Sequence, residues 1–256
     1  MSQPVPPRVP VPPEEVANAR RHSFTPRPNR ILAALPAADQ ARLEPDLTRE
    51  PLAFEQTLYR AEERITRVYF PESGVCSLTL TMEDGRTVEV GTVGYEGIVG
   101  LPLVFGAAIS PSAVICQVQG QALVMTADAF SREMRAHGAL FMAAAAYAQV
   151  FNLLTMQSAA CNRLHSVEER LGRWLLMTRD RLGTDRFPLT QQFIAYMLGV
   201  HRPSVTLVAR TLQKAGLIQY ERGIVTILDV PGLESATCEC YRAVNAHFDS
   251  IEPLGA

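Results

Sequence analysis

The chain has 256 residues, of which 47% are apolar, and a formal net charge of −2. This composition is too apolar for a disordered protein, and the length allows one or two domains. The five cysteines are scattered and no N-terminal signal peptide is visible, so we expect no disulfide framework and a cytoplasmic protein with reduced thiols.

The charge is distributed unevenly. Residues 163–222 carry ten basic and five acidic side chains, although the whole chain is slightly acidic. Such asymmetry fits contact with phosphates at one end of the molecule, and a merely soluble surface is the alternative. The most apolar stretch, residues 97–118, is broken by prolines and glycines and predicts no membrane span.

The N-terminal part predicts a tail followed by a β-domain. Residues 1–28 hold eight of the eighteen prolines and predict a disordered tail, with partner binding as the alternative. Residues 29–47 predict one or two short helices. Short strands are expected at residues 57–60, 67–70, 75–81, 87–90, 114–118 and 122–126, a spacing typical of a β-barrel, sandwich or roll.

Two turns are expected between these strands. Pro71-Glu72-Ser73-Gly74 predicts one of them. Asp84-Gly85 predicts a hairpin with a type I′ turn, which needs positive φ at both central residues.

Two helices are expected next. Residues 127–137 predict a short helix, with Thr126 or Asp128 as its cap. Residues 139–165 contain no glycine or proline and predict a rod approaching about 40 Å. Six of its residues recur at alternating three- and four-residue steps and predict a seam between two subunits, unless the helix packs only on its own β-domain. They are Ala144, Tyr147, Phe151, Leu154, Ser158 and Cys161.

The C-terminal part predicts a helix-turn-helix. Ser166 and Glu169 have the spacing of a capping box, which predicts a helix from there to about Arg181. In residues 190–217, Thr190 can cap a first helix and Gly199 can form the turn to a second. Strands expected at 217–220 and 224–227 would form a wing, which argues against an ordinary pair of helices. A last helix is expected near residues 235–248.

Three segments together make the sequence resemble the Crp/Fnr family of bacterial transcription regulators. They are TQQFIAYMLGVHRPSV, the following KAGLI, and VYFPESGVCSLTLTMEDGRTVEVGTVGYEGIVG. The resemblance implies an α+β fold: an N-terminal cyclic-nucleotide-binding-like β-roll, a long dimerisation helix and a C-terminal winged helix-turn-helix. The corresponding boundaries are a tail at 1–28, the roll at 29–137, the helix at 138–165, the DNA-binding domain at 166–232 and a helical tail at 233–256.

The same resemblance implies a homodimer that binds a palindromic operator in double-stranded DNA, responds to a signal and acts with RNA polymerase. The alternative is a ligand-sensing or protein-interaction module whose winged helix contacts protein. Pro203 and Leu207 depart from the polar residues of many members, so the operator is expected to differ. The residues expected at the DNA are Thr190, Gln191, Gln192, His201, Arg202, Ser204, Thr206 and Arg222.

The sensor departs from members that bind cyclic nucleotides. Leu101 stands in place of the ribose-binding Glu, and Pro111 in place of the phosphate-binding Arg, so cyclic AMP is not the expected effector. The positions implied for an effector pocket are Gly100, Leu101, Ser112, Ala113 and Thr155.

No metal or cofactor is expected. Residues 1–60 contain no cysteine for an iron–sulfur cluster, and Cys76 reads as a buried strand residue rather than a haem ligand. Cys238-x-Cys240 with His247 makes a weak metal motif. His137 and His165, at the two ends of the long helix, are expected to be surface or hinge residues. No nucleophile set, phosphate loop or HExxH motif is present, so no enzyme is expected.

Overall fold

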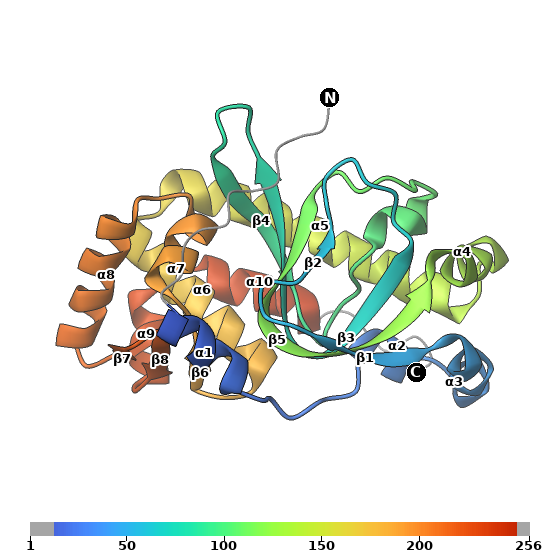
Figure 1. Cartoon of the computed structure of the whole chain (residues 1–256), viewed down its shortest axis with the longest axis horizontal. Coiled ribbons are helices and arrows are strands. Elements are labelled where there is room, and N and C mark those ends of the chain that lie inside the picture. Colours follow the sequence, from blue (N-terminus) through green and yellow to red (C-terminus); the bar gives the residue numbers. More distant parts are fainter. Residues whose placement is uncertain (1–12, 250–256) are drawn as a thin grey trace.

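The computed structural model describes residues 13–249. An antiparallel sheet of five strands, rolled on itself, forms most of the N-terminal half (Figure 1). Its strand order is β1-β5-β3-β4, with β2 also paired to β5. The strands are β1 (Thr48–Leu52), β2 (Thr57–Tyr59), β3 (Arg67–Thr81), β4 (Thr87–Val93) and β5 (Ala113–Thr126).

The roll is built on two strands that are longer than expected. β3 continues through residues 71–74, so the turn predicted there is wrong, and β5 joins the two strands predicted at 114–118 and 122–126. Bulges between Pro71 and Val75 bend β3 without ending its pairing to β5. At the bend Gly74 has φ +81°, and a Cβ there would stand 2.5 Å from the Val118 carbonyl oxygen. The chain therefore curves where we expected it to reverse.

The hairpin between β3 and β4 is confirmed, but its turn type is not. The Met82 amide donates to the Arg86 carbonyl at 2.8 Å, which encloses a loop of three residues. Gly85 has φ +83°, whereas Asp84 is not among the non-glycine residues with positive φ. This is a tight turn followed by one left-handed residue, rather than a type I′ turn.

Residues 13–28 form structure, which corrects the predicted disordered tail over that range; residues 1–12 lie outside the described part. Helix α1 (Pro13–Arg21) lies beside the C-terminal domain, and Ala19 is buried. The Arg27 amide donates to the Glu72 carbonyl at 2.7 Å, which ties the following segment to β3. The predicted short helices follow as α2 (Arg30–Ala33), α3 (Ala37–Leu43) and the 3₁₀ turn η1 (Glu44–Asp46).

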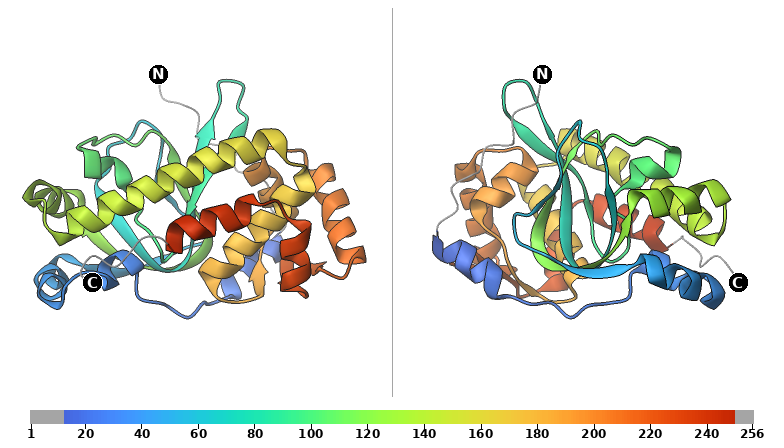
Figure 2. Two further views of the ribbon diagram at one scale, coloured as in Figure 1. Left: turned by 180° about the vertical axis from the view of Figure 1, so that it is seen from behind. Right: turned by 45° about the vertical axis from the view of Figure 1, so that its right-hand side comes forward.

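Two helices leave the roll as predicted. A 3₁₀ turn, η2 (Leu101–Phe105), precedes β5, and α4 (Ala127–Ala136) follows it with Thr126 as its cap. Helix α5 (Ala139–Leu164) then crosses the whole molecule (Figure 2). By length and composition α5 could span a membrane. It instead packs its apolar side against η2, β4 and α4, as the core helix of a folded domain does.

The seam predicted along α5 is wrong, because those residues pack inside the chain. Ala144 and Tyr147 are 0% exposed and Leu154 is 2% exposed. Phe151 is half-buried and would touch a Cβ placed on Gly91 of β4. A different stripe of α5 residues remains at the surface. It lies on another side of the helix from the predicted seam and also recurs at three- and four-residue steps. It consists of Met142, Ala145, Gln149, Asn152, Met156, Ala159 and Arg163.

The C-terminal half contains the predicted winged helix. Ser166 and Glu169 form the capping box of α6 (Val167–Leu182). A short strand β6 (Arg186–Pro188), which was not predicted, joins the wing strands in a sheet of order β6-β8-β7. The other elements are α7 (Gln191–Leu198), α8 (Arg202–Lys214), β7 (Ile218–Glu221) and β8 (Ile224–Ile227).

The last predicted helix is two helices, α9 (Val230–Ala236) and α10 (Cys240–Asp249). The predicted domain boundary between residues 232 and 233 falls inside α9. Helix α10 returns along α5, as the red ribbon in the left view of Figure 2 shows. Residues 250–256 of the predicted helical tail lie outside the described part.

Candidate nucleic-acid interface

Three residues determine where α7 begins and ends and where α8 starts. The Thr190 hydroxyl accepts from the Phe193 amide at 3.0 Å and begins α7. Gly199 ends α7 with φ +63°, a conformation that a side chain would oppose. Pro203 stands in the first turn of α8, where a missing amide hydrogen costs nothing. The two helices are thus joined by a three-residue turn, as in a helix-turn-helix.

The inner faces of both helices are buried against α6. Ile194, Ala195, Val205, Ala209 and Leu212 are each at most 2% exposed. The Arg170 guanidinium of α6 donates to the Leu198 carbonyl at the end of α7, where a positive charge is favourable. Because this packing occupies the inner faces, the opposite side of α8 is left for solvent or a partner.

The outer face of α8 carries a continuous exposed stripe. Its members follow three- and four-residue steps, which places them on one side of the helix. Leu207 is 69% exposed, which is unusual for a large apolar side chain without a partner. The stripe, which we call the α8 face, consists of Pro203, Leu207, Arg210 and Lys214, with His201 and Arg202 at its N-terminal end and Thr211 beside it.

Three of the residues predicted to contact DNA make hydrogen bonds within the helix-turn-helix. Thr190 is 3% exposed and acts as the cap, so the structure does not place its side chain at the surface expected to meet DNA. The Thr206 hydroxyl donates to the Gln191 side-chain oxygen at 2.7 Å, which links α8 to the first turn of α7. Gln191 and Thr206 therefore lie together at the edge of the α8 face, half-exposed. Gln192 and Ser204 are half-exposed as well.

The wing ends in a tight turn that presents a basic side chain. Glu221 pairs with Ile224, so the turn holds only Arg222 and Gly223, whose φ values are +49° and +76°. Positive φ at both positions is the type I′ pattern. Arg222 is exposed and lies 3.9 Å from the Glu221 carboxylate. A partner reaching the wing would meet this guanidinium.

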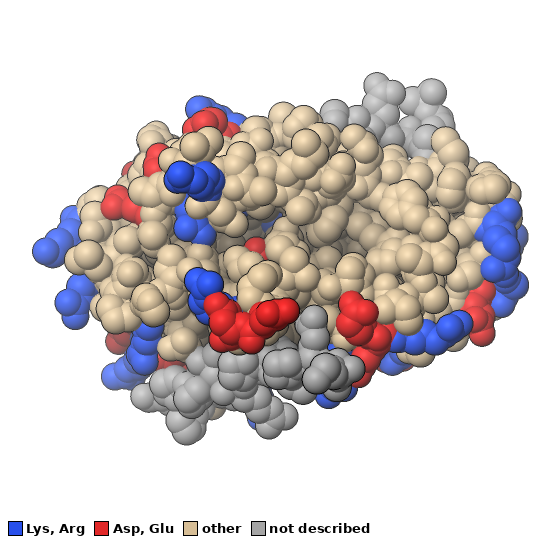
Figure 3. Space-filling view, turned by 90° about the horizontal axis from the view of Figure 1, so that it is seen from above, with Lys and Arg blue, Asp and Glu red and all other residues tan. Residues whose placement is uncertain are grey.

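Basic side chains gather around the α8 face. Arg202, Arg210 and Lys214 are exposed along α8, and Arg222 is exposed in the wing. In Figure 3, Lys and Arg side chains stand out at the end of the molecule that α8 forms. The sequence prediction named Arg202 and Arg222 but missed Arg210, Thr211 and Lys214. Helical spacing from Pro203 and Leu207 was the signal that could have found them.

The winged helix is docked against its own β-roll through polar groups that are partly or fully buried. The indole Nε1 of Trp174, on α6, donates to Glu89 Oε1 of β4 at 2.9 Å. The Ser77 hydroxyl donates to the other carboxylate oxygen at 2.7 Å. Burial raises the pKa of Glu89 to about 7, although these hydrogen bonds and the charges of Arg181 and Arg173 oppose the rise. Glu89 thus titrates at the contact between the two domains.

Replacing Glu89 with glutamine is expected to flatten the dependence of stability on pH. A carboxyl whose pKa is raised by folding stabilises the fold fully below its unfolded pKa, and this contribution is lost as the pH rises through about 7. The free energy of unfolding of E89Q relative to the unsubstituted chain should rise by about 2–3 kcal/mol between pH 5 and pH 8. Urea unfolding at four pH values measures this. A difference that does not change with pH would contradict the expectation.

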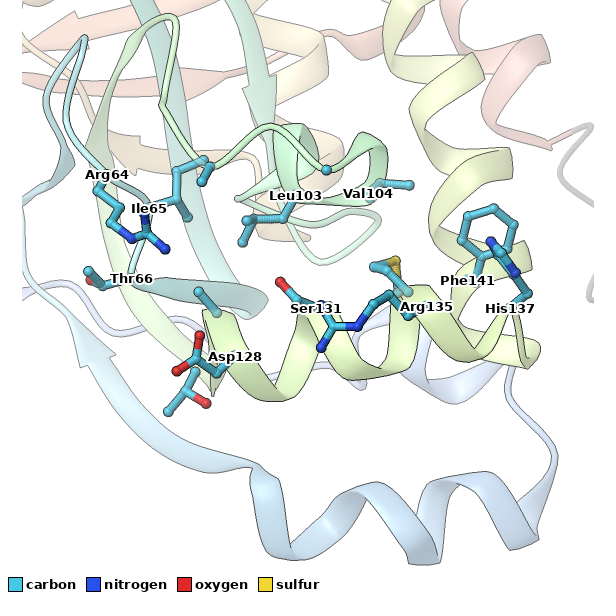
Figure 4. Close-up of a pocket in the computed structure, with 15 residues that line it drawn as sticks. Arg64, Ile65, Thr66, Leu103, Val104, Asp128, Ser131, Arg135, His137 and Phe141 are labelled. Atoms are coloured by element: carbon cyan, nitrogen blue, oxygen red, sulfur yellow. The ribbon is translucent and has the colours of Figure 1, made fainter.

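The β-roll has a cavity beside α4, and none of the five positions expected to form an effector pocket lines it. The Thr155 hydroxyl donates to the Phe151 carbonyl of its own helix at 2.9 Å, and Ser112 and Ala113 are each 5% exposed. Gly100 lies against Val68 and Tyr59, and Leu101 begins η2. The structure instead has a cavity of about 720 Å³ between η2, α4 and the start of α5. Figure 4 shows Arg64 and Asp128 toward one side of it, and Arg135, His137 and Phe141 toward the other.

The chain matches two known domain families. Residues 50–137 match the cyclic nucleotide-binding domain, and residues 169–236 match the Crp-like helix-turn-helix domain. No curated protein sequence matches the chain.

Solved structures share the fold at low identity. FixK2 from Bradyrhizobium japonicum is 14% identical with a TM-score of 0.65, over 75% of this chain and 98% of that chain. The c-di-GMP-responsive global regulator CLP from Xanthomonas campestris is 16% identical with a TM-score of 0.62, over 76% and 100% of the two chains. A CRP-family transcriptional regulator from Thermus thermophilus is 21% identical with a TM-score of 0.61, over 73% and 95%.

Proposed function

The chain belongs to the Crp/Fnr family of transcription regulators, and from this premise we propose that it is a sequence-specific DNA-binding protein whose α8 face enters the major groove. The observation that carries the proposal is the exposed stripe of α8, which combines basic residues with Leu207 and Pro203. Arg202 can bond a guanine through two guanidinium nitrogens, and Leu207 can contact a thymine methyl. Arg210, Lys214 and Arg222 would contact phosphates.

We propose further that the protein acts as a homodimer on a palindromic site. The exposed stripe of α5, with Met142 and Met156 at 50% and 60% exposure, supports this because it follows the steps of a coiled-coil seam. Two α8 helices related by this seam would read half-sites about one helical turn, or 34 Å, apart. The proposal places the protein in the cytoplasm, with RNA polymerase as a further partner by family resemblance, and gives it no catalytic role.

The signal that the β-roll senses is proposed to be other than cyclic AMP. Leu101 and the exposed Pro111 supply neither an acceptor for ribose nor a cation for a cyclic phosphate. The cavity beside α4 is the candidate site for a different ligand, because Arg64 and Arg135 at its lining could bind an anionic group.

Arg202→Ala is expected to weaken binding to the selected operator by about 1–3 kcal/mol and to relax the preference at one base pair. The operator is first selected from a random DNA pool, and affinities are then measured on it and on single-base variants. Arg60→Ala is the matched control, because Arg60 is an exposed arginine on the β-roll, paired to Glu63. Equal weakening on every sequence would make Arg202 a phosphate contact.

The competing function is a module whose winged helix binds protein rather than DNA. It predicts no preference for any duplex over scrambled competitor at modest salt, with or without cell extract as a source of the missing signal. That result would overturn the proposed function.

A further inference from the structure

Three cysteines and a histidine meet where α5 ends. Cys161 and His165 are one helical turn apart, on one side of the end of α5. Cys238 lies in the break between α9 and α10, and Cys240 is the first residue of α10. The three cysteines are 0%, 4% and 0% exposed, and the His165 side chain is 16% exposed. The weak motif seen in the sequence paired the two C-terminal cysteines with His247, and the structure supplies Cys161 and His165 instead.

Two distances within this cluster match those of a tetrahedral metal site. Cys161 Sγ lies 3.6 Å from Cys238 Sγ, and Cys240 Sγ lies 3.5 Å from His165 Nδ1. All four ligand atoms lie within 4.8 Å of one another. A tetrahedral zinc ion with Zn–S near 2.3 Å and Zn–N near 2.0–2.1 Å separates two sulfurs by about 3.8 Å and a sulfur from a nitrogen by about 3.5 Å. The observed pairs fit within a few tenths of an ångström.

A second layer of groups is in place to orient the ligands. His165 Nε2, the nitrogen that faces away from the cluster, lies 3.4 Å from the Glu239 carboxylate. A carboxylate behind a ligating imidazole fixes its tautomer and orientation. The Gln157 side-chain amide donates to Cys240 Sγ at 3.0 Å, an arrangement that suits a thiolate. These contacts are those expected around a metal ligand set.

The charge of the surroundings suits such a complex. Three thiolates and a divalent ion carry a net charge of about −1. Arg170 and Arg173 of α6 lie close enough to Cys161 to interact with it electrostatically. Both arginines are buried, and the Nε of each lacks a hydrogen-bond partner in the described structure. A negatively charged metal complex would balance these two buried guanidinium groups.

We propose that Cys161, His165, Cys238 and Cys240 bind one structural zinc ion. Binding releases the three thiol protons and leaves no coordination position for water, as in closed Cys₃His sites. The ion would tie the end of α5, immediately before α6 begins, to the segment that follows the wing. The same joint already holds a hydrogen bond from the Thr237 hydroxyl to the Glu169 carbonyl at 2.8 Å. Zinc would therefore fix the angle at which the long helix meets the DNA-binding domain.

The test is the metal content of the full chain, purified with a thiol reductant in metal-free buffers. Elemental analysis should find about one zinc per chain, and replacement by Co²⁺ should give the visible absorption of a tetrahedral site with its thiolate charge-transfer band. Cys240→Ser and His165→Ala should remove the ion. His247→Ala and Cys116→Ala are the matched controls and should retain it, since Cys116 is a buried cysteine that faces Cys76 in the β-roll.

Two further measurements keep the result clear if a variant folds poorly. Glu239→Gln leaves all four ligands intact and should weaken zinc affinity about 10-fold. Chelation of the unsubstituted chain should speed amide exchange at residues 161–169 and leave the β-roll amides unchanged. Failure of the reduced chain to bind zinc on reconstitution, or a Cys161–Cys238 disulfide in its place, would overturn the proposal. None of these readouts depends on DNA binding.

Discussion

Replacing Arg181 with methionine is expected to cost about 3–5 kcal/mol of folding free energy, because it leaves a carboxylate buried without its counter-charge. Arg181 Nε donates to Glu96 Oε1 at 2.8 Å, and the two side chains are 6% and 8% exposed. The Gly94 amide is the other donor to this oxygen, at 3.1 Å, and Glu96 Oε2 has no partner in the described structure. The pair joins α6 to the segment that follows β4, so its loss should also loosen the docking of the winged helix.

Urea unfolding measures this cost, and the chain offers a control on the same helix. Arg179 is 32% exposed in its ion pair with Asp185, so Arg179→Met should cost about 1 kcal/mol or less. The double variant R181M/E96Q removes both charges and should recover much of the loss. Equal costs for R181M and R179M would show that the buried pair contributes no more than a surface one.

Met156→Glu is expected to separate the proposed dimer and to lower affinity for the palindromic operator by about 100-fold or more. A carboxylate placed in the seam is repelled by its copy on the other subunit, and a monomer loses the gain that comes from binding two half-sites together. Met156 is 60% exposed, so the change should leave the fold of one chain intact. Sedimentation velocity and titration of labelled operator measure the two effects.

Met82→Glu is the matched control for this experiment. Met82 is 47% exposed at the β3–β4 hairpin and does not belong to the exposed stripe of α5, so its replacement should change neither mass nor affinity. A dimer that survives M156E would move the subunit contact to another surface of the chain.

The helix-turn-helix could be predicted from the sequence because its signals are local. Thr190 and Gly199 specify a cap and a left-handed turn within one short segment, and each acts there as expected. The wing could be predicted for the same reason, because two short apolar strand patterns, which form β7 and β8, lie directly on either side of the turn at Arg222-Gly223. The order of the domains was predicted from the family resemblance rather than from local sequence signals.

The features that escaped prediction depend on which surfaces meet after folding. The stripe with Tyr147 and the stripe with Met156 have the same spacing along α5, and only packing against the β-roll decides which is buried. Cys161 and His165 are far in sequence from Cys238 and Cys240, so their meeting requires the return of α10 along α5. We predicted that Thr190 would both cap α7 and contact DNA. Its short side chain is buried, so it serves only as the cap.

The return of α10 has a consequence for how the protein is made. Phe248 of α10 is 7% exposed and stacks near Tyr147 of α5, with ring centroids 6.5 Å apart, so it completes a core that begins a hundred residues earlier. During synthesis on the ribosome, this part of the core stays incomplete until α10 has emerged.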